Sequence, residues 1–393
     1  MKKPEDYSVR ARVKFLDGMR GVAAAYVMIG HAYLYIRERV DPAVSQTFRK
    51  TLRLLDYGHY AVAIFIVLSG FLLMLPVAQS THGQLRGGSA GFIRRRARRI
   101  LPPYVAAVCV SVVVLILVPA VRDVGDLSLG SILTHLLLIH NLFPQYLMSL
   151  NGPLWTVAME WQIYFLLPFA FLPVWKRGGI VALLTVGITL GLLPLAVLPA
   201  RYNLSWTSPW YVGLFAFGAT GALIAFSAEP SAAWVRARAR WRISTAALLA
   251  LLALLFGLEI DAAWRPLWAK DLLLGAIIVS VILALIESPA NVPTHRRADP
   301  RHRPEQLVLR FLTCRSIATL GTFSYSIYLI HEVLLLAISH VLLQLSWPAA
   351  TLLIAQFCVG VPVTLALCYT FFRLFERPFL PTSSRTESDA VGG

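Results

Sequence analysis

The stretch from Tyr60 to Ala78, YAVAIFIVLSGFLLMLPVA, contains no charged side chain and is close to the roughly 20 apolar residues that an α-helix needs to cross a bilayer. If a few polar interruptions are allowed, the chain holds ten such stretches. They begin near Gly21, Tyr60, Ile100, Pro153, Gly179, Pro209, Ile243, Asp271, Leu320 and Ala349. An eleventh apolar stretch, from Leu129 to Phe143, is too short to cross. The sequence therefore predicts an all-α polytopic membrane protein with about ten transmembrane helices and one short re-entrant or interfacial helix.

The composition excludes a water-soluble globule. Of 393 residues, 57% are hydrophobic and only 14% are charged, whereas a soluble domain carries about 25% charged residues. The same hydrophobicity excludes a disordered chain. The net charge of +16 comes from Lys and Arg that are separated by long uncharged stretches, so it indicates loops at a membrane surface, and no nucleic-acid partner is expected. The four cysteines form no CxxC pair, and neither a disulfide framework nor a metal site is expected.

The distribution of basic residues tests the number of crossings, because one extra crossing inverts every later loop. With ten crossings and a cytoplasmic N-terminus, 27 of the 36 Lys and Arg fall on the cytoplasmic side. We therefore expect a multi-pass protein of the inner (cytoplasmic) membrane, with both termini in the cytoplasm and an uncleaved first span. Residues 1–380 are expected to form one transmembrane domain, and residues 381–393 a disordered polar tail.

Ionisable groups inside a span are costly and are candidates for function. Arg20 and His31 stand eleven residues apart in FLDGMRGVAAAYVMIGH, and eleven steps of about 100° return to the same face of a helix. His31 is expected near mid-membrane, with Arg20 at the cytoplasmic surface. Two structural alternatives stay open, an arginine that snorkels at a span end and a histidine that hydrogen-bonds another helix. Because an imidazole can deprotonate a hydroxyl near neutral pH, His31 is a candidate base.

A second candidate lies in PLWTVAMEWQIYFLLP, where Glu160 stands near the start of an otherwise apolar helix. Glu160 and Tyr164 share a helix face at spacing i, i+4, so the carboxylate can be held by the phenol or can orient an imidazole. We expect Glu160 to be catalytic and Trp155 and Tyr164 to line the same cavity. The alternatives are a structural ion pair for Glu160 and an interfacial belt position for Trp155.

The stretch GTFSYSIYLIHEVLL places Ser324, Tyr328 and His331 at spacing i, i+4, i+7. This pattern is a polar stripe on a buried helix, which we expect to line the far wall of the cavity. Hydrogen bonding between helices is the structural alternative. Glu332 is expected to point elsewhere, and no second histidine follows it at metalloprotease spacing, so zinc is not expected.

A basic cluster precedes the third predicted span, in FIRRRARRILPPYV. Positive-inside anchoring explains some or all of these arginines. Guanidinium groups at one membrane entrance also form a site for a polyanion such as the phosphates of a nucleotide-like donor. The candidate donor-binding residues are Arg95, Arg96, Arg98, Arg99 and Tyr104.

At these residues the chain resembles the acyltransferase-3 family of integral membrane acyltransferases, which includes O-antigen, peptidoglycan and nodulation-factor O-acetylases. The matching segments are LDGMRG at 16–21 followed by His31, AVAIFIVLSGFLL at 61–73, RRARRILPPY at 95–104, LWTVAMEWQIYFLLP at 154–168, SYSIYLIH at 324–331 and ERPF at 376–379. The six segments follow the family order over most of the chain. Carried over by these motifs, the family's site residues are Arg20, His31, Arg95, Arg96, Arg99, Trp155 and Glu160.

The resemblance implies a ten-helix domain that takes an acyl group, commonly acetyl, from a cytoplasmic donor such as acyl-CoA. Its implied acceptor is a hydroxyl of a sugar, glycan or glycoside. We therefore predict a membrane O-acyltransferase that works in a lipid bilayer with acetyl-CoA as cosubstrate and no permanently bound cofactor, and that is compatible with a homo-oligomer. His31 is predicted to act as general base or to carry the acyl group transiently.

In the same prediction, Arg20 and the arginine cluster hold the donor's phosphates. The alternative is a transporter or flippase of a small solute or lipid-linked sugar, which would use the same buried charges as a proton relay. A non-catalytic membrane scaffold is a third alternative.

Overall fold

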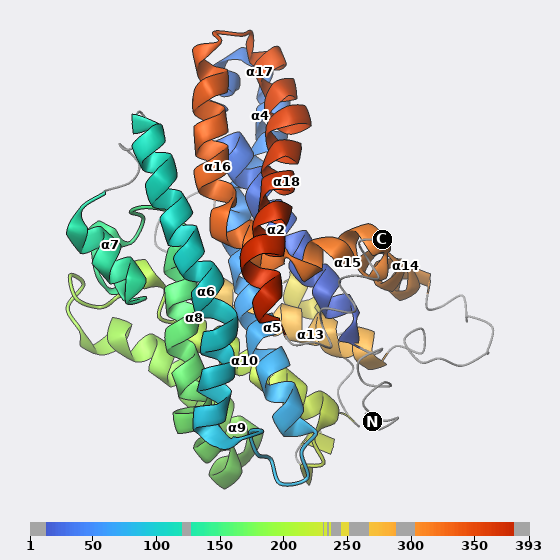
Figure 1. The fold of residues 1–393 in the computed structure, drawn as a ribbon. Coiled ribbons are helices and arrows are strands. Elements are labelled where there is room, and N and C mark those ends of the chain that lie inside the picture. Colours follow the sequence, from blue (N-terminus) through green and yellow to red (C-terminus); the bar gives the residue numbers. More distant parts are fainter. Residues whose placement is uncertain are drawn as a thin grey trace. The chain divides into compact units, whose positions relative to one another are not determined.

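The computed structural model describes residues 13–119, 127–230, 232–233, 236, 245–250, 267–287 and 303–380. Every regular element in these ranges is a helix (Figure 1), which confirms the all-α prediction for them. The chain divides into two compact units that are each built from separated segments. The first unit comprises Met1–Arg20, Ala63–Phe92 and Ile163–Ala318, and the second comprises Gly21–Val62, Ile93–Gln162 and Thr319–Gly393. The predicted tail, residues 381–393, lies outside the described residues.

Seven helical segments among the described residues are long and apolar enough to cross a membrane. They are Gln46–Ala78, Gly88–Leu117, Leu154–Val197, Ser205–Phe226, Leu267–Ile286, Ser324–Gln344 and Ala349–Phe379. The chain is therefore a multi-pass membrane protein, and the count of ten crossings stays a prediction. The predicted first span corresponds to α2 (Phe15–Leu34), whose 20 residues include Asp17 and His31. Most of the predicted span from Ile243 lies outside the described residues.

The long segment Leu154–Val197 covers two predicted spans. It consists of α8 (Leu154–Leu166), the π-helical η6 (Leu167–Phe171) and α9 (Leu172–Val197). Inside α9, Gly179 has φ 68° and ψ −164°, a conformation that glycine tolerates because it lacks a Cβ, and the helix breaks there. The break coincides with the predicted start of a span near Gly179.

The first unit is packed through small residues. Its main helices are α5 (Gly58–Ala78, from Ala63 onward), α9, α10 (Tyr211–Phe226), α13 (Leu267–Glu287) and α14 (Arg303–Thr313), followed by the start of α15 (Arg315–Thr322). A Cβ on Gly70 would lie 2.1 Å from the carbonyl oxygen of Phe215. A Cβ on Gly218 would lie 1.9 Å from that of Val67. The backbones of α5 and α10 are therefore in direct contact, as membrane helices achieve with small interfacial residues.

The second unit contains a larger number of short helices beside its long ones. Its helices are α2 from Gly21 onward, α3 (Arg37–Val40), η1 (Asp41–Ala43), α4 (Gln46–Leu52), η2 (Arg53–Tyr57), α6 (Gly88–Leu117, from Ile93 onward), α7 (Leu129–Leu136), η4 (His140–Leu142), η5 (Pro144–Tyr146), most of α8, α16 (Ser324–Gln344), α17 (Ala349–Ala355), η11 (Gln356–Gly360), α18 (Val361–Phe371), η12 (Phe372–Glu376) and η13 (Arg377–Phe379). Helices α16 and α18 lie side by side (Figure 1). Polar groups link its helices, since Gln356 donates to the Ala32 carbonyl oxygen at 3.1 Å and to Ser339 Oγ at 2.9 Å.

The short stretch 129–143 begins with α7, which has only eight residues and is therefore about 12 Å long. Such a helix cannot cross a bilayer, in agreement with the predicted short helix. Ser131 and His135 face the protein interior, whereas Leu129 and Leu133 are exposed. Apolar side chains outside and polar ones inside suit a helix whose outer face meets lipid.

Candidate functional site

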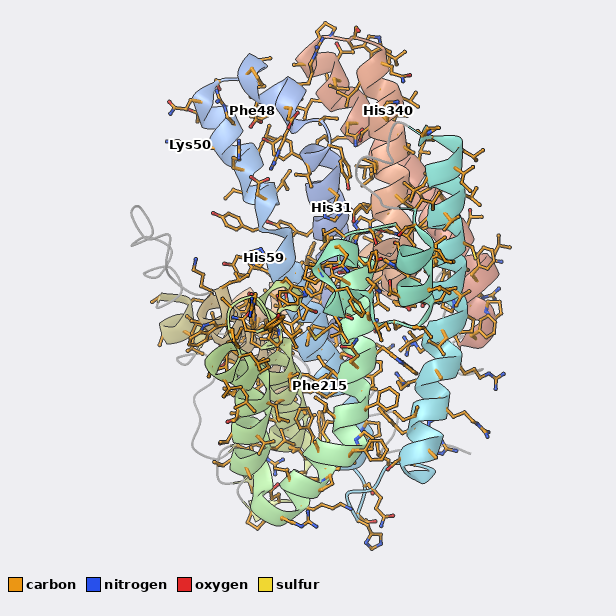
Figure 2. The ribbon with its side chains drawn as sticks, turned by 90° about the vertical axis from the view of Figure 1, so that its left-hand side faces the viewer. His31, Phe48, Lys50, His59, Phe215 and His340 are labelled. Atoms are coloured by element: carbon orange, nitrogen blue, oxygen red, sulfur yellow. The ribbon has the colours of Figure 1, made fainter. Side chains whose placement is uncertain are left out.

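Two histidines that lie 300 positions apart in the sequence contact each other in the second unit. His31 Nδ1 lies 2.9 Å from His331 Nε2, and the two ring planes differ by 4°. His331 is fully buried, while His31 is half-buried near the C-terminal end of α2 (Figure 2). The structure therefore brings two of the predicted site residues together.

The hydrogen bonds of His331 determine which nitrogen of His31 stays available. His331 Nδ1 lies 2.8 Å from the carbonyl oxygen of Ile327, which can only accept, so this nitrogen carries a proton. With both rings neutral, His331 Nε2 is an acceptor and His31 Nδ1 is the donor between them. His31 Nε2 then keeps its lone pair, which is what a general base requires.

A cavity of about 250 Å³ adjoins this pair. Its lining includes His31, Arg37, Asp56, His59, Trp155, Tyr328 and Glu332, and Figure 2 shows two of them, His31 on α2 and His59 at the start of α5. Trp155 and Tyr328 are predicted cavity-lining residues. The volume is slightly below the roughly 300–1,000 Å³ of ordinary small-molecule sites, so it suits a small ligand or one unit of a larger one.

The expectation that Glu332 points elsewhere is wrong, since its side chain lines the same cavity as Tyr328. Tyr35, which lies one residue beyond α2, donates to Glu332 Oε1 at 2.7 Å. Neither residue was predicted to belong to the site. The signals were present, because Tyr328 and Glu332 are spaced i, i+4, and so are His31 and Tyr35.

The other members of the predicted polar stripe have different partners. Tyr328 Oη lies 2.5 Å from Thr156 Oγ1, which connects α16 to α8 in the second unit. Ser324 donates to the carbonyl oxygen of Gly321 at 2.9 Å and is absent from the residues that line the cavity. Glu160 is half-buried on α8 and does not line this cavity either, so its catalytic role stays a prediction.

Two predicted residues belong to the first unit. Tyr164 Oη lies 3.1 Å from Ser69 Oγ, which ties α8 to α5 within that unit. Arg20 is half-buried on α2. Their roles beside the histidine pair remain predictions.

The arginine cluster lies in the first half of α6. Arg95 and Arg98 are exposed, whereas Arg96 and Arg99 are half-buried. The fifth predicted donor-binding residue, Tyr104, is fully buried and donates to the carbonyl oxygen of His135 at 3.0 Å, so its hydroxyl anchors α7.

A second pair of histidines joins α7 to η4. The rings of His135 and His140 stack with centroids 3.7 Å apart, and both are fully buried. Burial lowers the pKa of His135 to about 4 and lowers that of His140 further, with the neighbouring His135 adding to the effect. Both rings are therefore neutral at pH 7. Among the described residues, no group of three or more His, Cys, Asp or Glu is placed to hold a metal ion.

Comparisons with known proteins assign the family. The model of the acyltransferase-3 family, described as an acyltransferase domain, matches residues 13–373. "Protein 2 in picA locus" of Rhizobium radiobacter is 30% identical over 162 residues, which are 39% of this chain and 76% of that protein. No solved structure gives a significant match. The chain therefore belongs to the acyltransferase-3 family and is a membrane acyltransferase, and the transporter and scaffold alternatives no longer apply.

Proposed function

We propose that this enzyme transfers an acyl group, in the simplest case acetyl, from acyl-CoA to a hydroxyl of a sugar, glycan or glycoside. The observation that carries the proposal is the hydrogen bond between His31 and His331 beside a small cavity. This hydrogen bond leaves the lone pair of His31 Nε2 available to a ligand. A base held in one tautomer next to a cavity for a small ligand is what hydroxyl activation needs.

In the proposed reaction, His31 Nε2 takes the proton of the acceptor hydroxyl as its oxygen attacks the thioester carbonyl carbon. A carbon–oxygen bond forms and the carbon–sulfur bond breaks, and the proton passes to the leaving thiolate to give free CoA. While His31 holds this proton it is an imidazolium, and the lone pair of His331 Nε2 accepts a hydrogen bond from its Nδ1. His331 thus has the orienting part that the carboxylate has in serine hydrolases.

The donor's phosphates would bind to the arginines of α6. Arg98 and Arg99 form no ion pair with a described residue, so both guanidinium groups are available to an anion. Arginine suits this task because its planar fork binds phosphate oxygens in pairs. Donor binding is proposed to take place on the cytoplasmic face of the inner membrane, with both termini in the cytoplasm.

The experiment adds labelled acetyl-CoA to the purified protein together with envelope polysaccharide from cells that lack the gene. We expect label on the polysaccharide, with a mass increase of one acetyl group on a sugar. Arg98→Gln and Arg99→Gln should raise the KM for acetyl-CoA more than they lower kcat. Arg39→Gln removes an exposed arginine elsewhere in the second unit and serves as the matched control. Transport of a sugar without a covalent change would contradict the proposal.

A further inference from the structure

Glu332 lines the cavity and has a buried carboxylate oxygen without a hydrogen-bond partner among the described residues. Glu332 is 8% exposed, and its Oε2 contacts no donor among the described residues. Its other oxygen, Oε1, accepts the phenol proton of Tyr35. Leaving one oxygen of a buried carboxylate unpaired is unfavourable because its hydration is lost without replacement. We propose that Glu332 Oε2 binds a second hydroxyl of the acceptor, next to the hydroxyl that His31 deprotonates.

The surroundings of Glu332 hold its carboxylate in place. A Cβ on Gly152 would lie 2.8 Å from Oε2 and 2.9 Å from Oε1, so any larger residue there would displace the carboxylate. The hydrogen bond from the Tyr35 hydroxyl to Oε1, at 2.7 Å, holds the other carboxylate oxygen in place. Residues on three separate segments therefore position an oxygen that has no partner within the described protein.

The charges of the cavity favour a neutral polyhydroxyl ligand. Glu332 and Asp56 would repel the phosphates of CoA. The nearby cation, Arg37, lies 3.7 Å from Asp56 and is already paired. Trp155 adds an aromatic face, against which the apolar face of a sugar ring can pack. This cavity is therefore assigned to the acceptor.

Two adjacent residues of α16 then have different roles in the site. His331 fixes the tautomer of His31, and the next residue, Glu332, orients the acceptor by a hydroxyl beside the one that is acylated. A site that is built to hydrogen-bond a hydroxyl discriminates strongly against analogues that lack it. The inference rests on the proposed function, and it specifies an acceptor with two neighbouring hydroxyl groups.

The test compares wild type, Glu332→Gln and Glu332→Ala as full-length protein in detergent. The donor is labelled acetyl-CoA and the probe is the unacylated envelope polysaccharide from cells without the gene. We expect Glu332→Ala to raise the acceptor KM at least tenfold while the KM for acetyl-CoA stays within twofold of wild type. Glu332→Gln, which keeps one accepting oxygen, should have an intermediate KM. Fragmentation of the product should locate the new ester beside a free hydroxyl.

Glu376→Gln is the matched control, because Glu376 is a buried glutamate of the same unit that accepts a hydrogen bond from Ser326 and does not line the cavity. Its acceptor KM should match wild type. If Glu332→Ala does not fold, Tyr35→Phe replaces it and should raise the acceptor KM severalfold. If wild type transfers no acetyl group, the proposed function fails, and this inference with it. If wild type is active but the folded variant keeps its acceptor KM within twofold, only the inference is overturned.

Discussion

The two units bury different kinds of side chain. Of the 23 polar or charged residues that are buried in the described part of the chain, 17 belong to the second unit. The first unit instead brings helix backbones into direct contact at glycines such as Gly70 and Gly218. Buried polar groups are costly in a membrane protein unless they are paired or used, so we expect the chemistry to take place in the second unit. The first unit is expected to contribute rigid packing.

The largest expected effect tests the packing of the first unit. Gly218→Val would place a side chain 1.9 Å from the Val67 carbonyl oxygen, a clash that only movement of the backbone can relieve. We expect almost no monodisperse protein in size-exclusion chromatography after solubilisation. Gly58→Ala is the control, because nothing lies within 4 Å of the added Cβ. A normal elution profile for Gly218→Val would show that this contact does not hold the unit together.

The next largest effect tests the positioning role of His331. His331→Phe keeps a buried ring but removes the acceptor for His31 Nδ1, so the tautomer of His31 is no longer fixed. We expect kcat to fall at least about tenfold with little change in KM, and the pH–rate profile to shift. His340→Phe alters a half-buried histidine of the same helix and should leave kcat and the pH–rate profile unchanged. Equal kcat values for His331→Phe and His340→Phe would show that His331 contributes packing and does not position His31.

A moderate loss of stability is expected at acidic pH. The pKa of His135 lies near 4 in the folded protein, below its ordinary value near 6.5, so the unfolded chain binds more protons between these values. The stability from this group is complete above pH 6.5 and is lost as the pH falls toward 4. The melting temperature should therefore drop between pH 7 and pH 5. A double variant, His135→Phe with His140→Phe, should show a smaller drop in melting temperature between pH 7 and pH 5. An unchanged drop would show that these two histidines do not cause the loss of stability in acid.

The smallest loss of stability is expected from a substitution in the loop after α2. Burial alone would raise the pKa of Asp41, but hydrogen bonds from Tyr33 and Arg53 outweigh it and lower the pKa overall. Its contribution to stability is present above the unfolded value near 3.9 and is lost as the pH falls below it. Because Arg53 is largely exposed, Asp41→Asn should lower the melting temperature by only a few degrees at pH 7. A large loss would indicate that this loop supports the cavity wall.

Much of the fold follows from composition and periodicity. Uncharged stretches near membrane thickness predict helices, and the break at Gly179 falls where one predicted span begins. The count of crossings is harder to predict, because α2 carries charged residues and is less apolar than the other spans. A short apolar stretch with polar interruptions, such as 129–143, also leaves its depth in the membrane undefined.

The candidate site could be predicted only in part, because its residues come from distant parts of the sequence. His31 and His331 stand out because histidine is rare within apolar stretches, but no single-sequence pattern shows that residues 300 positions apart will meet. Glu332 was not predicted as a site residue because it lies outside the stripe of Ser324, Tyr328 and His331, although it stands at i, i+4 from Tyr328. Tyr35 was not predicted either, although it stands at i, i+4 from His31.

The central claim is that His31 is the base for acyl transfer. The most direct measurement is the rate of acetyl transfer by folded His31→Gln, made together with its affinity for acetyl-CoA. We predict a rate at least about 100-fold below wild type, with acetyl-CoA affinity and melting temperature unchanged. A rate within twofold of wild type would contradict the account.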